Sequence, residues 1–146
     1  MEAGYVYQRD AHPNADDLAR RCGELHLFLH FYSAKNEREC DLAGALSEPI
    51  PIEFDRVMDR FNQLPGGYCE PDGAWGWNTA DQLTRTGGTM QAFGEQVMCV
   101  ETWGQIAARD WSRLLELFGL TMDTAVVQLV EQGTFVSAQA FAKQLS

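Results

Sequence analysis

The sequence lacks any long apolar run and has few basic residues. No stretch reaches the about 18–20 apolar residues that a membrane-spanning helix needs. The first ten residues hold no basic region followed by an apolar one, so we expect no secretory signal and a cytoplasmic location. The 146 residues include 11 Lys and Arg against 21 Asp and Glu, a net charge of −10. That charge repels a phosphate backbone, which argues against nucleic-acid binding.

The short motifs that carry known chemistry are also missing. The chain has no nucleophile elbow, no phosphate-binding glycine loop and no H-E-x-x-H zinc motif. Its four cysteines form no C-x-x-C pair and match no zinc spacing, and nothing in that spacing favours a disulfide. We therefore expect free thiols at Cys22, Cys40, Cys69 and Cys99, and a non-enzymatic protein without a metal or other cofactor.

The composition is that of an ordinary globular protein, with 45% hydrophobic and 22% charged residues. The length suits one domain, and no repeat or long linker divides the chain. We expect a single domain over 1–146, in which 1–13 form a flexible N-terminal arm. The acidity leaves two interpretations open, a solvated surface or a surface that attracts a basic protein partner.

Residues 24–32 (ELHLFLHFY) are the most informative stretch. Successive side chains of a strand point to opposite faces, so its alternation gives one apolar face and one mixed polar and aromatic face. Such a strand suits the centre of a sheet that has helices on one side only. The apolar face consists of Leu25, Leu27, Leu29 and Phe31, and the mixed face of Glu24, His26, Phe28, His30 and Tyr32.

Two amphipathic helices are predicted at 51–64 and 106–118. Pro51 suits a first helical position, and Gly119 suits the position just after a helix end. Apolar residues recur at helical spacing in both segments. They are Phe54, Val57, Met58, Phe61 and Leu64 in the first, and Ile106, Trp111, Leu114, Leu115 and Phe118 in the second.

Further strands are predicted at 89–93, 96–103 and 125–131. The first two flank Gly94-Glu95, which is typical of a two-residue hairpin turn. Trp75 and Trp77 share one strand face, but the sequence does not identify which side of the sheet this is. Alternation in 96–103 divides its side chains into two sets that point to opposite faces of the sheet. The two sets are Met98, Val100 and Thr102, and Val97, Cys99, Glu101 and Trp103.

The order of these elements predicts an α+β fold of the ferredoxin-like kind (β-α-β-β-α-β), an antiparallel sheet with both helices on one face. Strands 24–32 and 96–103 would be central neighbours. Short helices at 15–22 and 138–145 would be added at the two ends, while 33–49 could be helix or loop. Another α+β topology with the same two layers is the alternative.

Function is expected on the sheet face without helices. Monomers rarely leave a large aromatic patch exposed, so the N-terminal segment 1–22, the helix at 138–145 or a second copy in a homodimer is expected to cover it. The candidates for a ligand site or an interface are His26, Phe28, His30, Tyr32, Cys99, Glu101, Trp103 and Gln128.

The residue types on this face suggest three kinds of site. A shared metal ion is disfavoured, because His26 and His30 lie about 13 Å apart along a strand. An acid–base site with a histidine beside Glu101 would suit neutral pH, and Cys99 could be a nucleophile, but buried thiols are usually inert. Stacking of RNA bases on Phe28, Tyr32 and Trp103 is opposed by the net negative charge and by the missing RNA-binding signature.

We therefore expect a non-enzymatic binding or interaction protein that acts through this face or through its acidic surface. Its partner would be another protein or itself, with no nucleic acid and no membrane. The alternative is a small ligand-binding protein or enzyme with a pocket around His26, His30 and Glu101.

Four runs, PDGAWGW, QVMCVETWG, DWSRLLELFG and AVVQLVEQGTFVSAQAF, resemble small bacterial proteins with the same succession of segments and no assigned activity. The resemblance covers roughly the C-terminal half and departs at 79–92, where those proteins imply a shorter connection. It implies a bacterial, single-domain protein and transfers no site residue.

Overall fold

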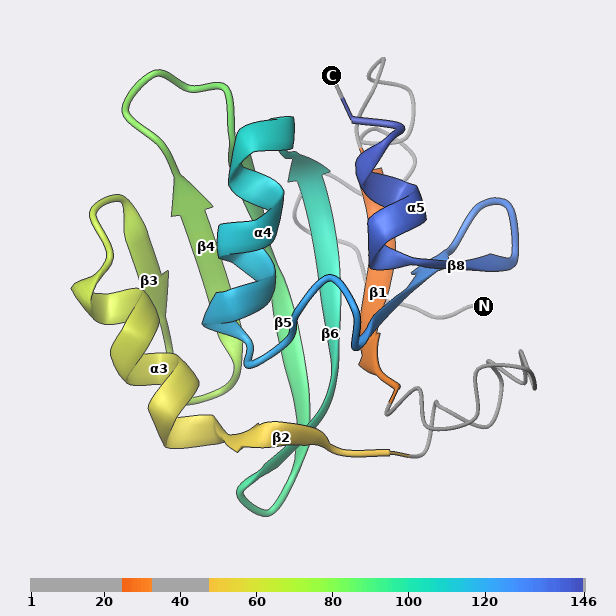
Figure 1. Ribbon diagram of the computed structural model, residues 1–146. Coiled ribbons are helices and arrows are strands. Elements are labelled where there is room, and N and C mark those ends of the chain that lie inside the picture. The colour runs from red at the N-terminus through yellow and green to blue at the C-terminus, as the bar shows by residue number, and fades with distance from the viewer. Residues whose placement is uncertain (1–24, 33–47, 146) are drawn as a thin grey trace.

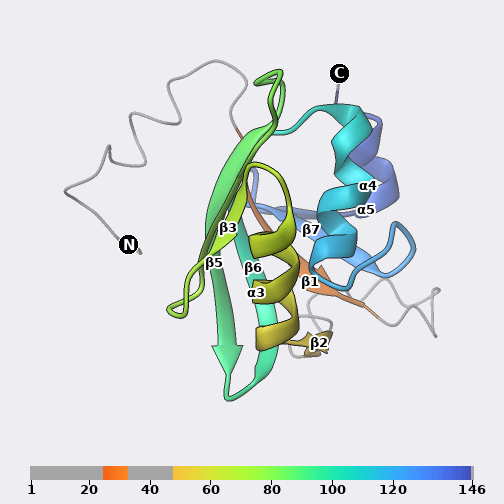
Figure 2. The ribbon, with the colours of Figure 1, turned by 90° about the vertical axis from the view of Figure 1, so that its left-hand side faces the viewer.

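The structure, a computed structural model, describes residues 25–32 and 48–145. The predicted arm at 1–13, the predicted helix at 15–22 and residues 33–47 lie outside the described residues. The helices of the described part are α3 (Phe54–Gln63), α4 (Ala108–Leu117) and α5 (Ala138–Ala142). They pack against one sheet (Figure 1) and lie on the same side of it (Figure 2). No described helix is long and apolar enough to cross a membrane.

The sheet has eight strands in the order β3-β4-β5-β6-β1-β7-β8, and β2 pairs with one end of β6. All the pairings are antiparallel. The elements are β1 (Leu25–Phe31), β2 (Ile50–Glu53), α3 (Phe54–Gln63), β3 (Gly67–Cys69), β4 (Ala74–Asn78), β5 (Arg85–Phe93), β6 (Gln96–Gln105), α4 (Ala108–Leu117), β7 (Ala125–Leu129), β8 (Thr134–Ser137) and α5 (Ala138–Ala142).

The predicted α+β class with an antiparallel sheet is confirmed, and so is the pairing of β1 with β6 at its centre. The ferredoxin-like order is not confirmed, because the sheet has eight strands in a different order. The turn at 71–73 folds its flanks into the hairpin β3–β4, which adds two strands beside β5. At the other edge β8 pairs with β7. Both additions come from local turns that widen the sheet.

The core lies between the sheet and the helices. Leu27 and Leu29 of β1 are fully buried, as the alternation predicts, together with Phe61 of α3 and Trp111 of α4. Burial of each large apolar side chain is worth about 1.5–3 kcal/mol, so this layer supplies much of the free energy of folding. Trp75 also lies in it, 5.3 Å from the Phe61 ring, which places the tryptophans of β4 on the helix side of the sheet.

Two local predictions are wrong. The helix predicted from Pro51 begins only at Phe54, because Ile50 pairs with Val97 and extends the preceding residues as β2. The predicted alternation of β6 breaks at Met98. Gln91 pairs with Cys99 but its neighbour Ala92 pairs with Val97, so one residue is left over as a bulge. The bulge turns Val97 into the core, where it is fully buried.

Candidate functional site

We call the sheet side on which no described helix lies the far face (Figure 2). The strand register brings most of the predicted candidates together on it. Trp103 of β6 lies opposite His26 of β1. Phe28 lies opposite Glu101 on one side and Gln128 of β7 on the other. Because β1 is the middle strand of these three, its polar and aromatic side chains form the centre of the group.

His26 makes the closest contacts on this face. Its Nε2 lies 2.8 Å from a carboxylate oxygen of Glu101, and both side chains are 22% exposed. Its ring stacks on Trp103 with centroids 3.7 Å apart and planes 9° apart. The hydroxyl of Thr89 donates to the other oxygen of Glu101 at 3.5 Å. The imidazole is therefore held in one orientation by a hydrogen bond at its edge and an aromatic ring on its face.

His30 is more deeply buried than His26 on the far face. Its Nε2 is 2.9 Å from Oε1 of Gln128, and the residue is only 5% exposed. Burial lowers the pKa of His30, an effect that the hydrogen bond to Gln128 partly opposes. Its Nδ1 is buried and has no hydrogen-bond partner among the described residues. At neutral pH His30 is thus an uncharged ring, flanked by Phe28 at 6.3 Å and Phe135 at 6.5 Å.

Cys99 does not have the character of a nucleophile. Its thiol donates to the side-chain carbonyl of Gln91 at 3.4 Å. Burial and the nearby charge of Glu101 raise the pKa of Cys99 to about 11, so the thiolate is scarce at neutral pH. The part of the chain that the structure describes also holds no group of three metal-ligating side chains.

Tyr32 lies two residues beyond His30, at the opposite end of β1 from His26. It follows the last residue of β1, where its backbone amide donates to the carbonyl of Thr124 at 2.7 Å. It is six residues beyond His26, which along a strand is about 20 Å.

The sequence did not predict a row of residues that crosses five strands of this face. Tyr68 of β3 lies opposite Gly76, Gly76 opposite Gly87, Gly87 opposite Trp103 and Trp103 opposite His26. We call these five residues the aromatic row. The Tyr68 ring covers Gly76, since a Cβ there would lie 2.4 Å from it. Tyr68 itself is 49% exposed.

The residue of the row that lies between the Tyr68 ring and Trp103 is a glycine. Gly87 carries no side chain, and an added Cβ would meet only backbone atoms, the nearest at 2.8 Å. Between the Tyr68 ring and Trp103 the row therefore has one position, Gly87, that carries no side chain and is half-buried. The tight spacing of glycine with tryptophan in AWGW and the Gly87-Gly88 pair were the signals in the sequence, but only the register aligns them.

Two cavities in the described part of the molecule lie away from the predicted pocket around the two histidines. One is between α3 and α4 and the other is beside the β5–β6 turn, and neither is lined by His26, His30 or Glu101. No protein-family model, curated protein or solved structure matches the chain.

Proposed function

We propose that this chain is a non-enzymatic binding protein that holds a protein partner, either another protein or a second copy of itself, on its far face. The observation that supports the proposal is the aromatic row, in which the Tyr68 ring covers Gly76 and Gly87 lies between this ring and Trp103. Partly exposed aromatic rings with polar edges are the side chains that contribute most to protein interfaces.

The polar groups of the row suit recognition. His26 is fixed by Glu101 at 2.8 Å and by its stack on Trp103, so binding would not have to immobilise it. Both Glu101 and His26 keep 22% of their surface exposed, which leaves them able to bond to a partner. An extended segment lying over Gly87 would contact both aromatic rings at once.

A small-molecule site or an enzyme is the second candidate. The pairing of His26 with Glu101 favours it, because such a pair orients an imidazole for proton transfer. The raised pKa of the Cys99 thiol opposes it, because it leaves little thiolate to act as a nucleophile beside the pair. Binding through the general acidity of the surface is less specific and would weaken with salt.

The test is to record the mass of the purified chain by native mass spectrometry and light scattering, and the proteins that cross-link to it in its own cell extract. Tyr68→Ala should abolish the self-complex or the stoichiometric cross-link. Phe93→Ala is the matched control, since Phe93 is an aromatic residue 80% exposed and outside the row.

A partner that survives Tyr68→Ala and Trp103→Ala as well as it survives the control would show that the row is not the interface. A chain that is monomeric at high concentration and cross-links to nothing would contradict the whole proposal. A small molecule that co-purifies and is lost with His26→Ala would favour the second candidate.

A further inference from the structure

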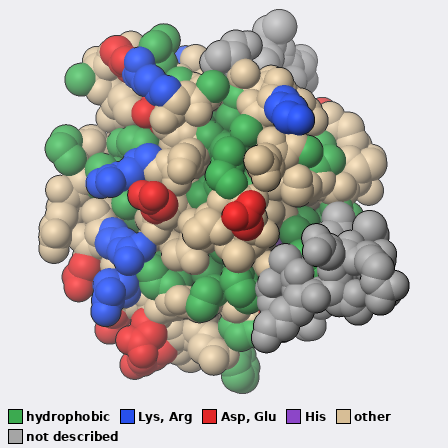
Figure 3. Space-filling model, viewed as in Figure 1, with side chains coloured by type: hydrophobic (Ala, Val, Ile, Leu, Met, Phe, Trp, Pro, Cys, Tyr) green, Lys and Arg blue, Asp and Glu red, His purple; other side chains and the backbone are tan. Residues whose placement is uncertain are grey.

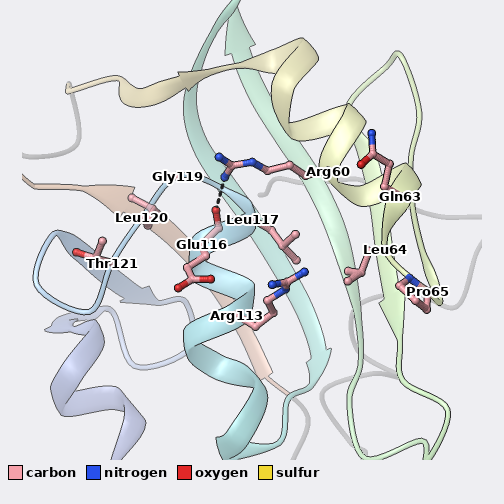
Figure 4. Close-up of a pocket in the computed structure, with 10 residues that line it drawn as sticks. All are labelled: Arg60, Gln63, Leu64, Pro65, Arg113, Glu116, Leu117, Gly119, Leu120 and Thr121. Atoms are coloured by element: carbon pink, nitrogen blue, oxygen red, sulfur yellow. Dashed lines mark hydrogen bonds between the residues drawn. The ribbon is translucent and has the colours of Figure 1, made fainter.

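A separate cleft lies on the helix side of the molecule, opposite the far face. It runs between α3 and α4 and has a volume of about 550 Å³. Figure 4 shows its lining, which comes from both helices and from the loop that follows α4. That volume is within the range of small-ligand sites, about 300–1,000 Å³.

Two guanidinium groups reach into this cleft from opposite helices (Figure 4). Arg60 of α3 donates through Nη1 to the backbone carbonyl of Glu116 at 2.6 Å, which fixes its position. Arg113 of α4 has no hydrogen-bond or ion-pair partner within the part of the chain that the structure describes. One cation is thus held in place and the other is available to a ligand.

The charge of the cleft lining is opposite to that of the whole chain. The chain has a net charge of −10, whereas α3 and α4 each carry two arginines and two carboxylates, and Figure 3 shows basic and acidic side chains side by side over them. Glu116 is the only carboxylate in the lining. No ion pair joins it to Arg113, and Figure 4 shows it turned toward Thr121, so the two arginines leave the cleft with a net positive charge.

The rest of the lining is largely apolar. The accessible apolar surface comes mainly from Leu64 and Pro65 next to α3, because Leu117 and Leu120 are only 4% and 1% exposed. Gly119, at φ +77°, makes the sharp turn after α4 that brings Leu120 back beneath the cleft. A ligand seated here would meet the two guanidinium groups and the apolar side chains next to α3.

We infer that the cleft between α3 and α4 binds a small organic oxyanion, a carboxylate or phosphate attached to an apolar body, with Arg113 and Arg60 on its oxygens and Leu64 and Pro65 against its body. Guanidinium groups suit both kinds of oxyanion because they can donate two parallel hydrogen bonds. This site is independent of the proposed function of the far face, since it shares no residue with the aromatic row.

The experiment uses the full chain labelled with ¹⁵N, titrated with octanoate, octyl phosphate, octanol and inorganic phosphate. We expect at least one of the two amphiphilic anions to shift the amide signals of residues 60–65 and 113–121 saturably. Octanol, which lacks the charge, and inorganic phosphate, which lacks the body, should bind at least tenfold more weakly. The stronger of octanoate and octyl phosphate identifies the preferred oxyanion.

Arg113→Gln should weaken that binding about tenfold, the amount expected for loss of one charge-assisted hydrogen bond. It should leave the fold intact, because Arg113 makes no bond within the described residues. Arg56→Gln is the matched control, since Arg56 lies one turn before Arg60 on the same helix and does not line the cleft. Tyr68→Ala should change nothing.

The inference is overturned if neither amphiphilic anion saturates, or if octanol binds as tightly as they do. It is also overturned if Arg56→Gln weakens binding as much as Arg113→Gln, since the effect would then be one of general charge.

Discussion

The side chain of Asn62 makes the two hydrogen bonds to the Cys69 backbone that a neighbouring strand would make. Its Oδ1 accepts from the Cys69 amide at 3.1 Å, and its Nδ2 donates to the Cys69 carbonyl at 3.2 Å. Asn62 lies on α3, whereas Cys69 ends β3, the outermost strand on that side of the sheet. The side-chain amide of Asn62 thereby pairs backbone N–H and C=O groups at the edge of the sheet that could otherwise pair with a strand of another chain.

Replacing this residue should lower stability. Asn62→Ala leaves two backbone groups of the buried Cys69 without partners, so we expect the free energy of unfolding to fall by about 1–3 kcal/mol in urea titrations. Gln63→Ala changes the adjacent exposed amide of the same helix and should have little effect. Equal stabilities of the two variants would contradict this role of Asn62.

The start of α4 is stabilised by a side chain that lies 23 residues earlier in the chain. Its N-cap residue is Ala107, which has no side-chain acceptor, and the hydroxyl of the fully buried Thr84 links the amide of this residue to Asp110 in the first turn. It accepts from the Ala107 amide at 2.9 Å and donates to Asp110 at 2.5 Å. Thr84→Val should cost about 1–3 kcal/mol of unfolding free energy, and Thr84→Ser should recover most of it. A Val variant as stable as the wild type would show that the bonds carry no net energy.

The burial of His30 makes stability depend on pH. Its pKa is lowered in the folded chain, so below about pH 6.5 the unfolded chain binds the proton more readily. This contribution to stability is complete above that pH and is lost as the pH falls below it. His30→Phe should therefore flatten the decline in unfolding free energy between pH 7 and pH 5. An unchanged slope would contradict the assignment.

The two described thiols should react slowly. Burial, aided by nearby carboxylates, raises the pKa of both Cys69 and Cys99 to about 11. In a chain with Cys22 and Cys40 replaced by serine, we expect both to react with a disulfide reagent at pH 8 roughly a hundredfold more slowly than in urea. Fast reaction of Cys99 in the folded chain would contradict this and would favour the enzymatic alternative.

Local patterns accounted for many of the elements. The alternation at 24–32 predicted β1 and its buried leucines, because the period of two depends only on the strand itself. The turn at Gly94-Glu95 lies at its predicted position, and Gly94 has the positive φ of 63° that such a turn requires. Helical spacing likewise located α4 to within two residues of its predicted start.

Predictions failed where a residue's neighbours come from elsewhere in the chain. Pro51 is a good helix start in isolation, yet pairing with β6 kept Ile50–Glu53 extended as β2. Strict alternation along the strand predicted that Val97 would lie on the same face as Cys99, but the bulge beside it turns its side chain into the core. In both cases the contacts with a partner strand outweigh a local preference of a fraction of a kcal/mol.

By itself, the sequence determined the two layers, the strand at the centre and which side of that strand is apolar, since each follows from periodicities within one segment. Only the tertiary structure decided which residues from distant segments lie beside one another. It placed Glu101 beside His26 across 75 residues of chain, aligned Tyr68, two glycines and Trp103 in one row, and brought Arg60 and Arg113 to one cleft. These juxtapositions depend on register and packing between distant segments, which no local pattern encodes.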